Sequence, residues 1–304
     1  MVKIKKHISK IISFIICIAI LISVPIISLK GTKKAGADDK LTVLTVWQID
    51  NFEGGKGSRA SYLKSVASKF SESYDCFLNI VSLNAEAAKI NLDAGTVPDL
   101  ISYGAGIFGI ENYIRDFTVW CRGGYCLLSV TESADFSDVT TENTVINTGV
   151  GNFAAIAATF NGLSGAIQDK PTGAYVKLIN GDFKYLLGTQ RDIYRLKTRG
   201  VSFAVKAITN FNDLYQNISI VTTDKKRAFY SEKFIGYLLD KSEGLTSLGL
   251  MLDGKTLYDD EMHELETVKQ FDYKIAAPIS YETKTSLEAA ISFNDENKLK
   301  NLLK

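Results

Sequence analysis

The sequence predicts an α/β protein built from two lobes. Strand and helix patterns alternate near its start, and its 304 residues exceed one typical domain. In addition, a β-rich stretch from Trp120 to Val130 leads away from these first patterns. Two lobes joined by crossing segments leave a cleft between them, and we expect any ligand to bind there.

The first 37 residues have the composition of an export signal. Residues 1–10 carry four lysines and no acid, and an apolar stretch from Ile11 to Leu29 follows directly. The small residues Ala35-Gly36-Ala37 suit a signal peptidase, so we expect cleavage after Ala37 and an extracellular or cell-surface protein. The alternative is an uncleaved N-terminal membrane anchor, because nineteen residues nearly span about 30 Å of hydrocarbon as a helix. Cys17 lacks the small preceding residues that lipid attachment requires.

The charge of the exported chain argues against nucleic acid as a partner. Removal of residues 1–37 takes away seven lysines and no acid, which leaves 28 basic and 34 acidic side chains and a net charge of −6. Phosphate binding draws on clustered Lys and Arg. The densest basic run that remains is Lys225-Lys226-Arg227, at the start of a predicted amphipathic helix, where solvated charge is ordinary. The 267 remaining residues suit two lobes of about 130 residues each.

Three cysteines remain after cleavage: Cys76, Cys121 and Cys126. An odd number cannot form a complete disulfide framework, and Cys76 is expected to be a buried thiol. Cys121 and Cys126 bracket two glycines, so a tight turn would allow a bridge. Two free thiols packed on strands are the simpler interpretation. The spacing is a weak metal signal, since no second cysteine pair or histidine lies nearby, and we predict no metal and no cofactor.

Strand and helix patterns alternate through the first lobe. Leu41 to Trp47 is a β-rich apolar run, typical of a strand buried in a parallel sheet. A glycine-rich loop follows, and Ser58 can cap a helix whose apolar residues recur at helical spacing as far as Phe70. The sequence then indicates a strand at 77–83, a helix at 85–93 and a strand at 99–103. This βαβαβ order implies a parallel sheet with right-handed crossovers.

The rest of the chain is expected to form the second lobe and then cross back to the first. We expect residues 120–130 to form a strand that crosses into the second lobe, with the hinge close by. Within that lobe the patterns indicate a helix at 153–163 and a strand at 183–187. Residues 188–192 then turn into a helix that runs through Leu196, and a strand follows at 201–208. Residues 217–222 should cross back, 228–239 should form an amphipathic helix, and 257–304 should pack around both lobes. The predicted boundaries are 1–37 for the signal, 38–120 with part of 245–304 for lobe 1, and 121–244 for lobe 2.

Five segments resemble one family of binding proteins, namely residues 44–59, 98–103, 120–128, 187–196 and 211–220. In order and number they are similar to the family 1 extracellular solute-binding proteins of bacterial sugar importers. The resemblance covers most of the chain beyond the signal, although many members have longer mature chains. It implies a type II periplasmic-binding-protein-like fold with crossing hinge strands. It also implies that a small polar ligand, expected to be a sugar or oligosaccharide, is held between the lobes and delivered to an ABC importer permease in the membrane.

Candidate binding residues follow from the rule that ligands of open α/β sheets sit beyond the carboxyl ends of the strands. Aromatic rings would stack on sugar faces, and amide, carboxylate and guanidinium groups would bond to hydroxyls. Core packing is the alternative for the two tryptophans, and a local salt bridge is the alternative for Arg191 and Asp192. The candidates are Trp47, Gln48, Asp50 and Glu53 after the first strand, Tyr103 and Gly104 after the third, Trp120 and Tyr125 on the crossing strand, and Gln190, Arg191 and Asp192 at a helix start.

The sequence argues against catalysis. His263 is the only histidine beyond the signal and lies in an acidic, polar stretch that we expect to be a surface helix. No G-x-S-x-G motif is present, and Glu-Met-His-Glu lacks the second histidine of a zinc protease. The loop at 54–58 departs from the phosphate-binding GxxxxGK[ST] order. A glycoside-acting pair of carboxylates remains as an enzymatic alternative. The main alternative is a membrane-anchored surface receptor that senses a ligand without transport; a monomer is expected in either case.

Overall fold

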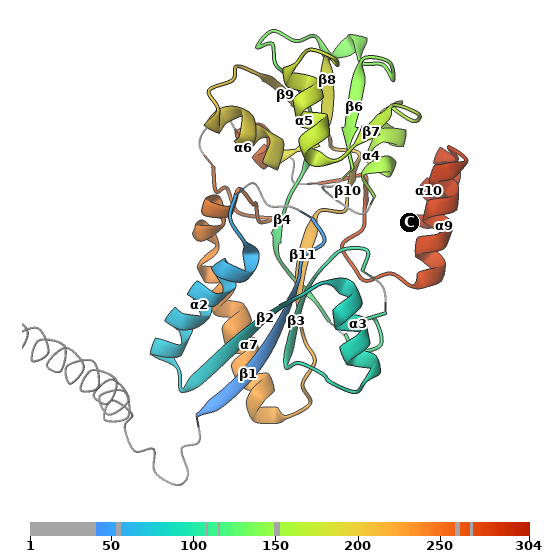
Figure 1. The fold of residues 1–304 in the computed structure, drawn as a ribbon. Coiled ribbons are helices and arrows are strands. Elements are labelled where there is room, and N and C mark those ends of the chain that lie inside the picture. Colours follow the sequence, from blue (N-terminus) through green and yellow to red (C-terminus); the bar gives the residue numbers. More distant parts are fainter. Residues whose placement is uncertain are drawn as a thin grey trace, which may run out of the picture. The chain divides into compact units, whose positions relative to one another are not determined.

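Two five-stranded mixed sheets organise the chain, one in each lobe (Figure 1). The computed structural model describes residues 41–52, 56–107, 109–114, 116–148, 153–258, 262–267 and 270–304. The predicted signal, its cleavage site, Cys17 and Glu53 lie outside these residues. Thr42–Lys304 forms one compact unit that contains both sheets. The predicted α/β class and two-lobed fold are confirmed.

The first sheet has the strand order β2-β1-β3-β11-β4. Its strands are β1 (Thr42–Ile49), β2 (Cys76–Leu83), β3 (Leu100–Gly104), β4 (Thr118–Arg122) and β11 (Tyr215–Ile220). β1 pairs in parallel with β2 and β3, whereas β11 runs antiparallel between β3 and β4. The crossovers are α2 (Arg59–Ser73) and α3 (Ala85–Asp93). The βαβαβ order predicted for residues 41–103 is therefore confirmed.

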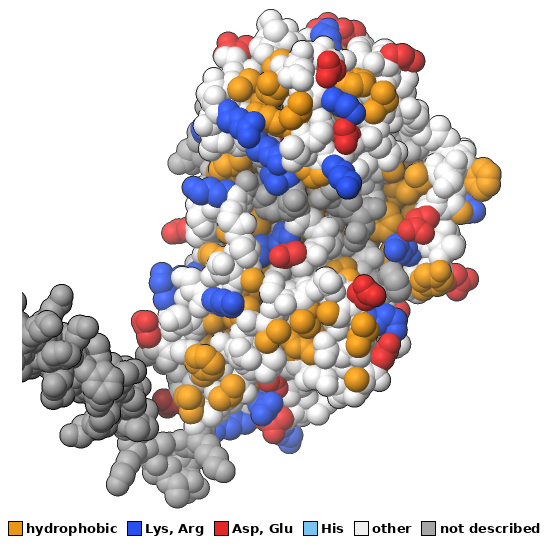
Figure 2. Space-filling model, in the orientation of Figure 1, with side chains coloured by type: hydrophobic (Ala, Val, Ile, Leu, Met, Phe, Trp, Pro, Cys, Tyr) orange, Lys and Arg blue, Asp and Glu red, His pale blue; other side chains and the backbone are white. Residues whose placement is uncertain are grey.

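Each face of the first sheet buries a different set of side chains. Ser58 caps α2 by accepting a hydrogen bond from the Ser61 backbone N–H, and Leu63 and Phe70 of α2 belong to the same buried apolar cluster as Leu44 of β1. On the opposite face, Trp47 packs with side chains of α3. The helix α3 leaves part of this face open, where Val43 of β1 and its register partner Phe77 of β2 are exposed. Figure 2 shows hydrophobic side chains at the surface over the strands of this lobe.

Helix α7 (Lys225–Asp240) belongs to the first lobe. The ring of Phe234 meets the ring of Phe70 in α2 edge-on, with centroids 5.5 Å apart. Arg227 pairs with Asp99, which precedes β3, at 3.0 Å. The predicted end of lobe 2 at residue 244 is therefore wrong. The chain returns earlier, because β11 completes the first sheet and the apolar stripe of α7 is buried against α2.

The second sheet has the strand order β7-β6-β8-β5-β9. β5 runs antiparallel to β8 and β9, and β6 runs parallel to β7 and β8. A short 3-10 turn, η1 (Phe136–Asp138), precedes β6. The strands are β5 (Tyr125–Ser129), β6 (Thr144–Asn147), β7 (Ile167–Asp169), β8 (Tyr185–Thr189) and β9 (Ala204–Ala207), and the helices are α4 (Ala154–Phe160), α5 (Pro171–Ile179) and α6 (Gln190–Thr198).

The described chain crosses between the lobes at three places. At the first, Gly123 and Gly124 separate β4 from β5, so the single strand predicted for 120–130 is two strands. Gln190 packs directly against Gly123, where a Cβ would lie only 2.7 Å from its side chain, so this crossing requires a glycine. The second crossing runs from β10 (Phe211–Asn212) into β11. At the third, Met251 exchanges two backbone hydrogen bonds with Arg122, of 2.8 and 2.9 Å.

The C-terminal region follows the third crossing. It comprises η2 (Ser242–Leu248), α8 (His263–Thr267), β12 (Tyr273–Lys274), α9 (Tyr281–Ser292) and α10 (Glu296–Leu302). η2 contacts α7 of the first lobe, α8 contacts β9 of the second, and α9 and α10 contact α4 (Figure 1). Within residues 257–304, α8, α9 and α10 contact the second lobe, and Ala276 O accepts a hydrogen bond from Asn217 Nδ2 of β11 in the first lobe, so this region contacts both lobes, as predicted.

The three described cysteines are free and buried. This confirms free thiols at Cys121 and Cys126 rather than a bridge. Burial raises the pKa of Cys76 to about 11, and the nearby Asp99 charge adds to the rise. Among the helices of the described residues, none is long and apolar enough to cross a bilayer.

Candidate functional site

The parallel strands of both sheets end toward the crossing segments. β8 ends at Thr189, and the next residue, Gln190, donates its backbone N–H to Gly124 O of the first crossing at 3.3 Å. β6 is parallel to β8 and ends at the same edge. In the first lobe, β3 and β4 both run antiparallel to β11, so β1, β3 and β4 all end toward this crossing. The carboxyl-terminal edges of the two sheets therefore face each other, which is where open α/β sheets bind ligands.

An ion pair between an exposed carboxylate and a buried guanidinium lies at this edge of the first sheet. Asp50 follows β1, and its Oδ1 accepts hydrogen bonds from Gln48 Nε2 at 2.7 Å and from Arg59 Nε at 2.6 Å. Arg59 is the first residue of α2 and only 5% exposed, and its guanidinium lies 4.1 Å from the ring centre of Phe52. The Arg59 charge is therefore balanced by Asp50 within a largely apolar setting.

A second buried group connects β1, β3, β4 and β11 behind the same edge. Gln216 Nε2 donates to Ile49 O and to Ser102 Oγ, each at 3.0 Å. Trp120 Nε1 donates to the same Ser102 hydroxyl at 3.0 Å. Gln216 and Ser102 are fully buried. These bonds fix the ends of the strands relative to one another.

The start of α6 forms the facing edge in the second lobe. Asp192 Oδ2 accepts from Thr189 N and from Asn147 Nδ2, each at 3.1 Å, and Thr189 caps the helix in return. Asp192 thus caps the helix. Burial raises the pKa of its carboxyl, although the hydrogen bonds from Thr189 and Asn147 act to lower it. Burial also lowers the pKa of Arg191. Asp192 forms a local ion pair with Arg195, at 3.8 Å, one turn further along the helix.

Unpaired polar atoms occur on both facing edges. Gln190 is fully buried; its Oε1 accepts from Gly124 N at 3.0 Å, whereas its Nε2 has no hydrogen-bond partner among the described residues. Buried polar groups are nearly always paired, so each such atom indicates a missing partner. The unpaired buried atoms at these edges are two donors, Arg59 Nη1 and Gln190 Nε2, and four acceptors, Gln48 Oε1, Asn51 Oδ1, Gln216 Oε1 and Asp192 Oδ1.

These atoms lie around the first crossing. The Arg59 charge acts on Cys121 of β4, which is also the register partner of Gln216. Gln190 contacts Gly123, two residues further along the chain. The two lobes therefore bring unpaired polar groups to the same short stretch of backbone, and a ligand or ordered water there would complete their hydrogen bonds.

The aromatic candidates lie in the cores. Trp47 and Tyr103 share one apolar cluster and are 4% and 0% exposed. Trp120 stacks on Tyr62 with ring centroids 6.1 Å apart, and Tyr125 donates its hydroxyl to Asp213 Oδ1 at 2.6 Å. Core packing, the alternative for the two tryptophans, is what the structure shows. None of these four rings presents an open face at the sheet edges, and a stacking role stays a prediction.

The structure brings Gln48, Asp50 and Gln190 to the facing edges, and it adds two residues that sequence reasoning missed. These are Arg59 and Gln216. The strand of Gln216 also contains Asn217 and Ser219, so no local signal singles out Gln216, and the inward direction of Arg59 follows only from the fold. The candidate Gly104 ends β3, where the side chain of Asn51 lies directly over it. Among the described residues, no group of three or more His, Cys, Asp or Glu side chains is placed to hold a metal ion.

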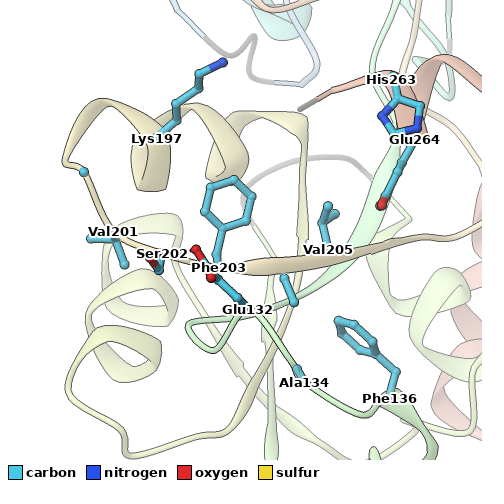
Figure 3. A pocket seen from close by; sticks show the side chains of 12 residues that line it. Glu132, Ala134, Phe136, Lys197, Val201, Ser202, Phe203, Val205, His263 and Glu264 are labelled. Carbon is cyan, nitrogen blue, oxygen red and sulfur yellow. Dashed lines mark hydrogen bonds between the residues drawn. The ribbon is translucent and has the colours of Figure 1, made fainter. Parts of the chain in front are cut away.

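A separate recess of about 650 Å³ lies along β9, the edge strand of the second sheet (Figure 3). Its lining includes Glu132, Lys197, Phe203 and, from α8, His263 and Glu264. His263 is exposed on a short helix, as predicted. None of the residues with unpaired atoms at the facing edges lines this recess, so it is not part of the candidate site.

Solved structures share this fold. Iron-bound HitA from Pseudomonas aeruginosa is similar with a TM-score of 0.54 and 12% identity, over 82% of this chain and 99% of that chain. At this identity the likeness shows the fold alone, which is the two-lobed, type II periplasmic-binding-protein-like fold.

Two further structures are less similar. The substrate-binding domain of a putative molybdenum ABC transporter from Clostridium difficile has a TM-score of 0.46 and 13% identity, over 69% of this chain and 98% of that chain. A Streptococcus pneumoniae ABC uptake transporter substrate-binding protein with bound histidine has a TM-score of 0.42 and 17% identity, over 67% and 88%. None of the three is named for a sugar. No family model and no curated protein matches the sequence.

Proposed function

We propose that this chain is an exported solute-binding receptor that captures a small polar ligand between its lobes and delivers it to an ABC-type permease. The observation that carries the proposal is the set of unpaired buried polar atoms on both facing edges. A ligand that bonds to both lobes stabilises their closed arrangement by its higher affinity for that arrangement. A permease can then recognise the closed receptor. The receptor acts as a monomer outside the cell or at its surface.

The ligand is neutral and rich in hydroxyl groups, as sugars and oligosaccharides are. The unpaired atoms include both donors and acceptors, and a hydroxyl group is the simple group that serves both. Asp50 balances the charge of Arg59, so the cluster has little net charge to attract an anion. An oxyanion would also leave the carbonyl oxygens of Gln48 and Gln216 facing negative charge. Gln48, Asp50, Gln190 and Arg191 remain the proposed contacts from the sequence, to which we add Arg59 and Gln216.

Gln190→Glu is the substitution that tests this site. The glutamate keeps an oxygen to accept the Gly124 N–H but replaces the unpaired Nε2 donor with a second oxygen. Loss of one hydrogen bond together with the added repulsion should weaken binding at least about tenfold. Gln168→Glu is the matched control, because it makes the same charge change at an exposed position of β7.

The measurement begins with a thermal-shift screen of the exported protein against mono- and oligosaccharides, since a ligand of the folded state raises the melting temperature. Calorimetry with the best sugar then compares the two variants. We expect Gln168→Glu to bind as the unaltered protein does and Gln190→Glu to bind more weakly. Equal affinity in both variants would remove Gln190 from the site. Stabilisation by sulfate, molybdate or amino acids and by no sugar would refute the ligand class.

A further inference from the structure

A groove of about 410 Å³ lies beside the C-terminal helices, and we call it the C-terminal groove. Its volume falls within the range of about 300–1,000 Å³ that is usual for small-molecule sites. Its walls come from the start of β4, from the segment Ile275–Ile279 and from α9 and α10. The lining is mainly apolar and includes Phe117, Val119, Ile279, Leu287, Leu302 and Leu303.

The charged side chains that line the C-terminal groove are Lys274, Lys304 and Asp253. Asp253 forms an ion pair with the buried Arg122, so its charge is already balanced. Lys274 and Lys304 are exposed and therefore lie where the groove meets solvent. The groove combines an apolar wall with a positively charged opening.

The two lobes contribute different walls to the groove. Val119 belongs to β4 of the first lobe. Helices α9 and α10 contact α4 of the second lobe, where Lys300 Nζ lies 5.8 Å from the ring centre of Phe160. The wall between them is anchored to the hinge strands, because Ile275 N donates to Asn212 O at 3.0 Å and Asn217 Nδ2 donates to Ala276 O. An occupant of the groove would therefore contact both lobes and the segment that joins them.

We propose that the C-terminal groove binds an amphipathic carboxylate, with the alkyl chain along Leu287, Leu302 and Leu303 and the carboxylate at Lys274 and Lys304. Burial of the alkyl chain supplies a hydrophobic gain roughly proportional to the area covered. The lysines favour an acidic head group over a neutral one. Because the walls belong to different lobes, occupancy favours the lobe arrangement in which the groove is open. This site is separate from the facing edges of the sheets, and its existence does not depend on the ligand bound there.

Calorimetric titration of the exported protein with decanoate, below its micelle-forming concentration, tests the proposal. Decanol and acetate serve as comparison ligands, because decanol has the alkyl chain without the charge and acetate has the charge without the long chain. We expect saturable binding of one decanoate, binding of decanol weaker by about three- to fivefold, as exposed charge pairs contribute, and no binding of acetate. Decanol binding as tight as decanoate would overturn the proposal, as would the absence of decanoate binding.

Two variants locate the bound decanoate. Ala277→Leu enlarges an exposed side chain that lines the groove and should abolish binding, whereas Ala94→Leu at the exposed end of α3 should not. Lys274→Gln should weaken decanoate binding by about three- to fivefold, and the exposed Lys298→Gln on α10 should leave it unchanged. Unaltered decanoate binding by Ala277→Leu would overturn the assignment to this groove.

Discussion

Asp213 joins the returning segment to the second lobe, and removal of its carboxylate should cost several kcal/mol. The residue is fully buried between β10 and β11. Its Oδ1 accepts the Tyr125 hydroxyl at 2.6 Å, and its Oδ2 accepts the Phe153 backbone N–H at 3.1 Å. Burial raises the pKa of Tyr125 well above its usual range, and the Asp213 charge adds to the rise, so the hydroxyl keeps its proton.

Asp213→Ala leaves both of these donors buried without an acceptor. Each orphaned donor costs about 1–3 kcal/mol, so the free energy of unfolding should fall by about 3–5 kcal/mol. Asp213→Asn keeps one acceptor oxygen for the Phe153 N–H, and the Tyr125 hydroxyl can accept from the new amide. The asparagine variant should therefore lose only about 1 kcal/mol.

Thermal unfolding followed by calorimetry measures the difference. In a chain of this size 1 kcal/mol corresponds to about 2–4 °C, so Asp213→Ala should lower Tm by about 6–20 °C and Asp213→Asn by less than about 5 °C. Asp182→Ala removes an exposed carboxylate and serves as the control. If Asp213→Ala melts within the error of this control, or if the alanine and asparagine variants melt together, the buried carboxylate does not hold the segment in the way described.

Three further outcomes follow from backbone geometry, burial and charge. Gly106→Ala should lower Tm more than Gly95→Ala. Both glycines have positive φ (+76° and +79°), but only at Gly106 would an added Cβ meet another side chain, the ring of Phe153 at 2.5 Å. Equal losses of Tm would show that this contact contributes nothing. The pKa of Asp192 is raised, so the folded protein binds the carboxyl proton more tightly than the unfolded chain does. The stability that the protonated carboxyl contributes is therefore full below the unfolded pKa and is lost as the pH rises through the folded pKa. Asp192→Asn should therefore flatten the fall in urea stability as the pH rises above about 4, and an unchanged slope would contradict this. A thiol reagent at about pH 8 should label none of the three described cysteines in the native protein and all of them in urea, because they are buried and the pKa of Cys76 is about 11; rapid labelling of the native thiols would argue against their burial.

The first lobe could be predicted from its sequence because each of its early elements carries a local signal. β1 is a long apolar run, and α3 has the bounds that its pattern predicted, Ala85–Asp93. In the second lobe, β6 and β7 have four and three residues, too few to show a period, and they depend on pairing within the sheet. α5 was also missed, although Pro171 at its first position is a helix-start signal.

The candidate site was predictable in position but not in the direction of its side chains. The strand-end rule predicts Gln48, Asp50 and Gln190 near the facing edges, and the structure has them there. The rule did not separate the two faces of β1, where Trp47 enters the apolar cluster under α3 and its neighbour Gln48 enters the polar one. Gln216 reaches the same place from a strand more than 160 residues later, as its bond to Ile49 O shows. No local pattern reports such a long-range approach.

Gln190 has a consequence for any attempt to change what the protein binds. One end of its amide accepts the Gly124 N–H of the first crossing, and the other end is the unpaired donor at the facing edges. Ligand recognition and hinge motion would thus depend directly on the same side-chain amide, without other residues between them. A substitution that removes the whole amide would change the ease of hinge motion together with the affinity. Redesign toward a new ligand should accordingly leave Gln190 unaltered and begin at Gln48 or Gln216, whose amides donate within the first lobe.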